Sequence, residues 1–137
     1  MAAAGYSGTP LIKKLGIKPE SKLVLLNIPD NYFDLLEQDV SSQLCRKGER
    51  PDIIHLFAER FSIFEQYIQQ AKKLMQPHTA IWVSWYKKSS GMATDITEDR
   101  VREYILNNGL VDIKVCAVNE WWSGLKCVVP VKLRGKE

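Results

Sequence analysis

The sequence predicts an α/β fold, and three observations lead to this prediction. Short apolar runs such as Leu23–Leu26 have the length and composition of strands that are covered on both faces. Amphipathic segments alternate with these runs, and residues 59–75 carry an apolar side chain every three or four positions. The chain has 137 residues, 45% hydrophobic and 26% charged, which matches the size and composition of one globular domain.

The first predicted elements are a short helix and a strand. Thr9 is expected to cap a helix with Pro10 at its first position, and Gly16 is expected to end it in the left-handed conformation. After a turn, residues 22–28 form a strand around the continuous apolar run Leu23–Leu26, and Pro29 and Asp30 stop it. Residues 32–37 follow as a short helix.

The middle of the chain predicts two further strands, a long helix and another strand. Residues 40–46 are a weaker strand candidate, whereas residues 53–57 form a buried strand. The apolar stripe then predicts a helix over residues 59–75, which Pro77 helps to end. Residues 79–86 are rich in Ile, Val and Trp, as is typical of a strand.

The last third predicts a helix and two strands. Thr97 begins the helix, its first turn carries two acidic residues that suit the helix dipole, and residues 107–109 end it. Residues 110–118 and 125–133 are the predicted strands. Because only residues 119–124 separate them, we expect them to pair as an antiparallel hairpin.

This order of elements predicts how the chain is arranged. Strands that alternate with helices pair in parallel, with right-handed crossovers and helices on both faces of the sheet. We therefore expect a Rossmann-like three-layer sandwich with a mostly parallel sheet and a C-terminal antiparallel hairpin. Residues 1–137 are expected to form a single domain, with a helix and turn over 1–21, the sheet and its helices over 22–133, and a tail over 134–137. The pattern resembles a reduced methyltransferase-like Rossmann fold.

Composition excludes several classes of function. The formal net charge of +3 falls short of the basic stripe that nucleic-acid binding needs, and residues 86–88 are the only hint of one. The three cysteines include no Cys-x-x-Cys pair, which argues against a disulfide framework and a zinc site. The opening residues lack the pattern of a signal peptide, and no apolar run is long enough to cross a membrane. We expect a cytoplasmic protein.

The exit of the first strand lacks the residues of a nucleotide or S-adenosylmethionine site. Such sites use glycines after the first strand, so that the backbone approaches the ligand. Residues 27–31 contain no glycine, and Pro29 lacks an amide donor. Asp30 and Asn31 are interpreted as a helix cap rather than as ligand contacts. The sequence identifies no cofactor, no metal site and no catalytic residue.

A second strand exit offers a candidate anion site. Two ammonium groups, two hydroxyls and the free amides at the start of a helix suit a phosphate or a carboxylate. These residues are Lys87, Lys88, Ser89, Ser90, Thr94 and Asp95. The alternative is a solvated lysine turn. No P-loop pattern occurs in the chain.

The tryptophans and one histidine predict how side chains divide between core and surface. Trp121 and Trp122 are adjacent and cannot face the same way, so we expect one buried and one exposed indole. Trp82 and Trp85 lie three apart on a strand and should point to opposite faces. His55 lies within an apolar strand and is expected to be a hydrogen-bonded core imidazole.

Three stretches resemble a known family. They are residues 5–16, beginning Gly-Tyr-Ser-Gly-Thr-Pro, residues 81–91 with 94–97, and residues 109–118 running on to 122–126. The chain looks like a small bacterial domain family of unknown function that opens with this motif. The resemblance implies a free-standing bacterial cytoplasmic protein and carries over no catalytic residue. It marks three segments that are mostly polar or contain glycine, residues 6–14, 87–97 and 122–126, which a core alone does not require. From them, Tyr6, Ser7, Thr9, Trp122 and Lys126 join the residues of the lysine loop as candidate ligand contacts.

We expect two or three of these segments to converge at one end of the sheet and to form a small anion-accepting pocket. Missing glycines and the lack of an acid/base constellation favour a non-catalytic binding or regulatory module, whose ligand is a small anion or a protein partner. The alternative is a diverged transferase-like enzyme with an atypical cofactor loop. Pairing of two copies through the hairpin edge also stays open, because an uncovered edge strand invites pairing.

Overall fold

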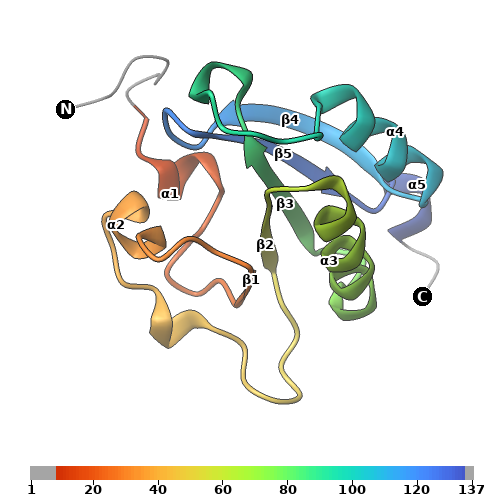
Figure 1. Ribbon diagram of the computed structural model, residues 1–137. Coiled ribbons are helices and arrows are strands. Elements are labelled where there is room, and N and C mark those ends of the chain that lie inside the picture. The colour runs from red at the N-terminus through yellow and green to blue at the C-terminus, as the bar shows by residue number, and fades with distance from the viewer. Residues whose placement is uncertain (1–8, 135–137) are drawn as a thin grey trace.

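A computed structural model describes residues 9–134 of the chain. These residues form a five-stranded sheet in the order β1-β2-β3-β5-β4 (Figure 1). The strands are β1 (Leu23–Leu26), β2 (Ile53–Ala58), β3 (Ala80–Tyr86), β4 (Val111–Ala117) and β5 (Trp122–Val128). The helices are α1 (Leu11–Lys14), α2 (Tyr32–Leu36), α3 (Phe61–Leu74), α4 (Glu98–Asn107) and α5 (Val131–Arg134), with 3-10 turns η1 (Ser41–Gln43) and η2 (Lys88–Ser90). No helix among residues 9–134 is long and apolar enough to cross a bilayer.

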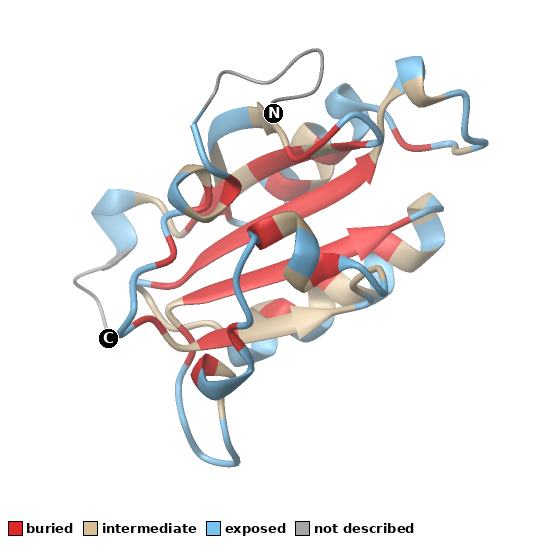
Figure 2. Ribbon diagram, turned by 90° about the vertical axis from the view of Figure 1, so that its left-hand side faces the viewer, coloured by how far each residue is buried: buried red, intermediate tan, exposed pale blue. Residues whose placement is uncertain are grey.

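Helices cover both faces of the sheet. On one face, α1 and α2 pack through Leu11 and Tyr32 into an apolar cluster. On the other face, α3 and α4 pack through Ile68 and Ile105 into a second cluster. The central strands between these layers are almost entirely buried (Figure 2). The chain therefore adopts a three-layer α/β arrangement of the Rossmann-like kind.

The sheet is mixed, which corrects the expectation of a mostly parallel sheet. β1, β2 and β3 pair in parallel, but β5 is antiparallel to both of its neighbours, β3 and β4. The chain forms β4 at the edge first and then returns, so that β5 fills the place between β3 and β4. Periodicity along the sequence identifies strands but not the order in which they are placed.

The ends of the chain's last strand also differ from the prediction. β5 begins at Trp122, three residues before the predicted start, because a tight turn leads directly into it. The side-chain oxygen of Asn119 accepts hydrogen bonds from the backbone amides of Trp121 and Trp122, both at 2.8 Å. Pro130 has no amide to donate to a ladder. Residues 131–134 accordingly form helix α5, where the sequence predicted the end of a strand and the first residue of a tail; residues 135–137 of that tail lie outside the described residues.

The predicted strand over residues 40–46 is wrong except at one residue. Residues 41–43 form η1, and only Leu44 makes a parallel bridge, to Leu23 of β1. The bridge lies on the edge of β1 that β2 does not occupy, since Leu23 also pairs with Ile53. The chain therefore passes outside β1 before it crosses to β2. This makes β1 the place where the winding direction reverses, which is where open α/β sheets usually bind ligands.

Several local predictions are confirmed. His55 is fully buried, with its two ring nitrogens each 2.8 Å from a hydroxyl, those of Tyr32 and Ser84. Trp82 and Trp85 belong to the clusters on opposite faces of the sheet. Trp122 is buried and Trp121 is 44% exposed. At the first helix, Gly16 has the expected positive φ of 77°, but the N-cap position is Pro10, one residue later than predicted.

Candidate functional site

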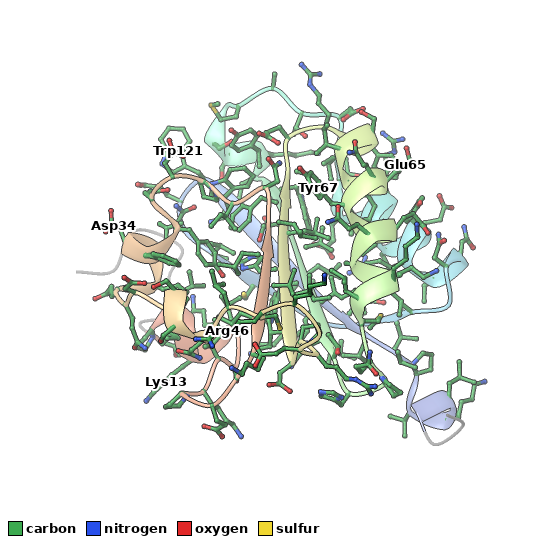
Figure 3. The ribbon with its side chains drawn as sticks, turned by 90° about the horizontal axis from the view of Figure 1, so that it is seen from below. Lys13, Asp34, Arg46, Glu65, Tyr67 and Trp121 are labelled. Atoms are coloured by element: carbon green, nitrogen blue, oxygen red, sulfur yellow. The ribbon has the colours of Figure 1, made fainter. Side chains whose placement is uncertain are left out.

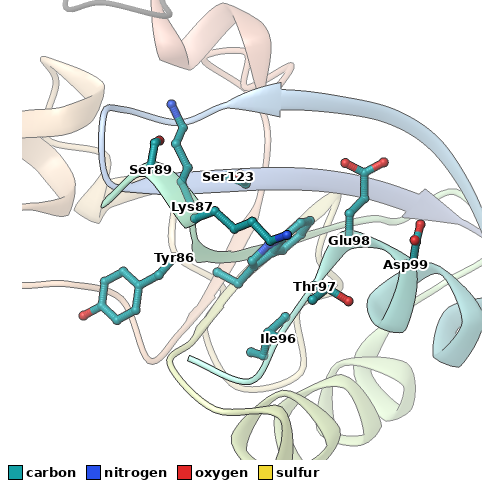
Figure 4. A pocket seen from close by; sticks show the side chains of 10 residues that line it. Tyr86, Lys87, Ser89, Ile96, Thr97, Glu98, Asp99 and Ser123 are labelled. Atoms are coloured by element: carbon teal, nitrogen blue, oxygen red, sulfur yellow. The ribbon is translucent and has the colours of Figure 1, made fainter. Parts of the chain in front are cut away.

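A pocket of about 580 Å³ lies beyond the carboxyl end of β3, between the loop that follows this strand and the start of α4. Lys87 and Ser89 lie on one side of it, and Glu98 and Asp99 lie on the opposite side, on α4 (Figure 4). The complete lining is Trp85, Tyr86, Lys87, Lys88, Ser89, Ile96, Thr97, Glu98, Asp99 and Ser123. The three expected residues Lys87, Lys88 and Ser89 thus share one pocket.

The loop after β3 is held by its own hydrogen bonds. The Ser90 hydroxyl donates to the carbonyl oxygen of Lys87 at 2.6 Å and accepts from the amide of Met92 at 3.1 Å. Gly91 closes the turn at a φ of 74°, a conformation that side chains disfavour. The amide of Lys87 donates to the carbonyl of Trp121 at 2.9 Å, which ties this loop to the β4–β5 turn. Ser90, expected as a ligand contact, therefore shapes the loop.

Thr94 and Asp95 hold the next segment in place. The Thr94 hydroxyl oxygen accepts from the amide of Ile96 at 3.2 Å. A carboxylate oxygen of Asp95 accepts from the amide of Phe61 at 2.8 Å, and so caps the start of α3 from a distant loop. This hydrogen bond is the main cause of a lowered pKa for Asp95. Neither residue lines the pocket.

The start of α4 carries both charge signs. Thr97 is the N-cap, and its hydroxyl oxygen accepts from the amide of Arg100 at 3.2 Å. The guanidinium of Arg102 donates to Glu98, to Asp99 and to Asp112. These contacts, chiefly those with Glu98 and Asp112, raise the pKa of Arg102. Arg102 therefore offsets part of the negative charge of Glu98 and Asp99. The electrostatic potential in the pocket is then set mainly by the two lysines.

The other predicted site residues lie elsewhere. Trp122 is buried beneath Tyr86, with ring centroids 4.2 Å apart, so it supports the pocket wall rather than lining it. Lys126 lines a different pocket, at the amino ends of the strands, and Thr9 lines a third, between α1 and β4. Tyr6 and Ser7 lie outside the described residues. The expected convergence of segments thus does not include Lys126 or Thr9.

Sequence reasoning missed the acidic side of the pocket. It assigned Glu98 and Asp99 only to the first turn of a helix. The four-residue spacing of Glu98 and Arg102 is the signal that predicts their ion pair on one helix face. Ser123 was missed because it lay in a predicted connection, whereas it belongs to β5.

The exit of β1 does not fit a nucleotide or S-adenosylmethionine in the usual manner. Asn27 has a φ of 55°, and its side-chain amide donates to the carbonyl of Phe57 at 2.8 Å and to Glu59 at 3.0 Å. This side chain spans the exits of β1 and β2, where a glycine-lined backbone would approach a cofactor. Pro29 follows it and offers no amide.

Comparison with known proteins shows the fold alone. No family model matches the chain, and no curated protein matches its sequence. A solved protein of the NADB-Rossmann superfamily from Streptococcus agalactiae is 8% identical with a TM-score of 0.57, over 92% of this chain and 70% of that one. A SAM-dependent methyltransferase from Aquifex aeolicus is 12% identical with a TM-score of 0.55, over 88% of each chain. The B. subtilis tRNA methyltransferase TrmK is 10% identical with a TM-score of 0.53, over 94% of this chain and 69% of that one.

These structures share a Rossmann-like α/β fold with this chain. The resemblance to a small bacterial family that opens with Gly-Tyr-Ser-Gly-Thr-Pro stays a prediction.

Proposed function

We propose that this chain is a diverged transferase-like protein that binds a small anionic molecule in the pocket beyond β3. The observation that carries the proposal is the pocket itself, where Lys87, Lys88 and Ser89 face the start of α4. A concave pocket of this size that is lined by several polar side chains is a usual place for a small ligand, and this one lies beyond the carboxyl end of a strand. The methyltransferase-like architecture of the solved neighbours supports a transferase-like protein over a purely non-catalytic module.

The polar groups of the pocket define the ligand by chemistry. The ammonium groups of Lys87 and Lys88 and the hydroxyl of Ser89 suit a phosphate or a carboxylate. The first amides of α4 lack partners within the helix and add to the positive field. Glu98 and Asp99 accept hydrogen bonds on the other side of the pocket. A ligand with an anionic group at one end and a hydroxyl or ammonium group at the other fits this division.

The loop after β1 is the atypical part of this transferase-like architecture. Because Asn27 spans the β1 and β2 exits, the residues there do not fit a methyl donor, and no catalytic step is assigned to one. A transferase with this loop binds its group donor at a place other than the β1 exit. Its anionic substrate binds in the pocket beyond β3.

A non-catalytic binding module is the second candidate, and the same loop favours it. Within the pocket, the titratable side chains are Tyr86, the two lysines and two carboxylates that already pair with Arg102. No pair among these described residues forms a hydrogen-bonded general acid and base. Binding without turnover is therefore the outcome that distinguishes this candidate.

A thermal-shift panel tests the proposal. It contains inorganic phosphate, pyrophosphate, small carboxylates, nucleotides, sugar phosphates and S-adenosylmethionine. A ligand at about a hundred times its Kd adds about 2.7 kcal/mol and raises the Tm by several degrees. We expect an anion to raise the Tm of the wild type but not of the Lys87→Ala/Lys88→Ala variant. Lys72→Ala/Lys73→Ala on α3 is the matched control, because it removes the same charge from another surface.

A shift by an anion, together with a further shift when a second class of compound from the panel is added, supports the transferase. A shift by an anion alone, without turnover, supports the binding module. If no compound shifts the Tm, or if both variants respond as the wild type does, the proposed site is wrong.

A further inference from the structure

The sheet has an open edge at β4, whose chemical character differs from that of the β3 pocket. β4 is the outermost strand, and among residues 9–134 it pairs only with β5. Such an edge presents backbone amides and carbonyls that accept an added strand. Lys114 is in register with Lys126 and Trp82, and therefore lies on the α1 side of the sheet. Val115 is in register with Leu125 and lies on the α4 side.

A groove of about 360 Å³ runs along this edge, between β4 and α1. Four consecutive β4 residues, 114–117, line one side, and Thr9, Lys13 and Lys14 line the other. The ammonium of Lys14 donates to the carbonyl of Ala117 at 3.4 Å, which joins the two walls. Three lysines and no carboxylate thus occur among the described residues that line the groove. The eight residues that precede Thr9 in the sequence also carry no acidic side chain.

On the α4 side of the edge strand, the apolar side chain of Val115 is 42% exposed. Ile113 is 54% exposed and lies at the irregularity of the ladder between Asp112 and Lys114, where it has no partner in register. An added strand places its alternate side chains over the two faces of its neighbour. Cross-strand pairs of opposite charge and of apolar side chains are the ones that stabilise such pairing.

We propose that the β4 edge binds an extended acidic peptide by strand addition. Acidic side chains lie beside Lys13 and Lys114, and the apolar side chains between them cover Val115. A second copy of this chain brings a second set of groove lysines, Lys13, Lys14 and Lys114, to the same edge, whereas an acidic peptide brings the opposite charge. The inference concerns a surface distinct from the β3 pocket and does not rest on the function proposed there.

Fluorescence anisotropy tests this surface with a labelled peptide of about eight residues in which Glu and Val alternate. A peptide in which Lys and Val alternate is the control for charge. We expect the acidic peptide alone to bind, and Lys13→Glu/Lys114→Glu to weaken binding roughly tenfold. The matched control is Lys72→Glu/Lys73→Glu on α3, which we expect to bind as the wild type does.

Amide hydrogen exchange gives a second measurement on the wild type, independent of whether the variants fold. Strand addition pairs amides of β4, so exchange of residues 113–117 slows when the acidic peptide is present. The proposal is overturned if the acidic peptide fails to bind, if the basic peptide binds equally, or if binding leaves that exchange unchanged. Inhibition by polyphosphate without slower exchange identifies a polyanion site and also overturns it. Concentration-dependent dimerisation that the peptide does not reverse assigns the edge to a second copy instead.

Discussion

The Nδ1 atom of His55 lies 2.8 Å from the hydroxyl oxygen of Tyr32, and both side chains are buried in the cluster between the sheet and α2. Burial lowers the pKa of His55 to about 3 and raises that of Tyr32. Both groups are therefore neutral in the folded protein at ordinary pH. The second ring nitrogen bonds to Ser84, so the imidazole has a partner on each side.

Folding stability should decrease as the pH falls from 6.5 towards 3. In this window the unfolded chain binds a proton at His55, with its ordinary pKa of 6.5, and the folded protein does not. Above pH 6.5, His55 does not make the free energy of unfolding depend on pH. Below it, the free energy of unfolding falls by about 1.36 kcal/mol for each pH unit, which amounts to about 2.7 kcal/mol by pH 4.5. Urea unfolding at several pH values measures this. His55→Gln should flatten the dependence above pH 5.5; an unchanged slope would contradict the assignment.

Replacement of Asn27 should distinguish strain from hydrogen bonding at the β1 exit. Its φ of 55° is open to glycine but strained for alanine. Both Asn27→Gly and Asn27→Ala lose the hydrogen bonds to Phe57 and Glu59. We expect the alanine variant to be about 1 kcal/mol less stable than the glycine variant in urea unfolding. Equal stabilities would mean that the backbone there relaxes easily.

Gly124→Ala should destabilise the protein, although alanine suits a strand better than glycine does. An added Cβ lies 3.2 Å from a Val118 methyl and 3.3 Å from the Trp82 ring. The ring has little freedom to move, because its Nε1 donates to the carbonyl of Leu15 at 3.0 Å. We expect a loss of about 1–3 kcal/mol in urea unfolding. The neighbouring Ser123→Ala is the control and should change stability by less than about 0.5 kcal/mol.

Arg102→Ala should weaken anion binding in the β3 pocket without touching the lysines. When the guanidinium of Arg102 is removed, Glu98 and Asp99 lose their partner. Their negative charge then repels an anionic ligand in the pocket. Calorimetric titration with pyrophosphate should show affinity reduced roughly threefold to tenfold, and Arg102→Lys should recover part of it. Glu98→Gln should act in the opposite direction. An Arg102→Ala variant that folds and binds with unchanged affinity would exclude this electrostatic account.

Much of the fold follows from local sequence patterns. The apolar runs located β1, β2 and β3, and the apolar stripe located α3, because burial on both faces or on one helix face dictates those residues. The mixed sheet did not follow, because the position of β5 between β3 and β4 depends on long-range pairing. Its early start depends on a single side chain, the Asn119 oxygen that closes the turn.

The candidate site was predicted only in part. Lys87, Lys88 and Ser89 were identified because polar residues that follow a buried strand lie beyond its carboxyl end, where α/β sheets bind ligands. Asp95 was expected to bind a ligand, but its carboxylate caps α3, a contact between residues 34 positions apart that no local pattern encodes. Figure 3 shows how far apart such segments can lie: Lys13 of α1 and Glu65 of α3 are on opposite sides of the view.

The affinity of the Lys87→Ala/Lys88→Ala variant for pyrophosphate, measured by calorimetry beside the wild type and the Lys72→Ala/Lys73→Ala control, tests the central claim most directly. The account predicts that the wild type and the control bind alike, while the pocket variant loses at least about tenfold in affinity and keeps its fold. Equal binding by all three proteins, or binding by none, would contradict an anion site beyond β3.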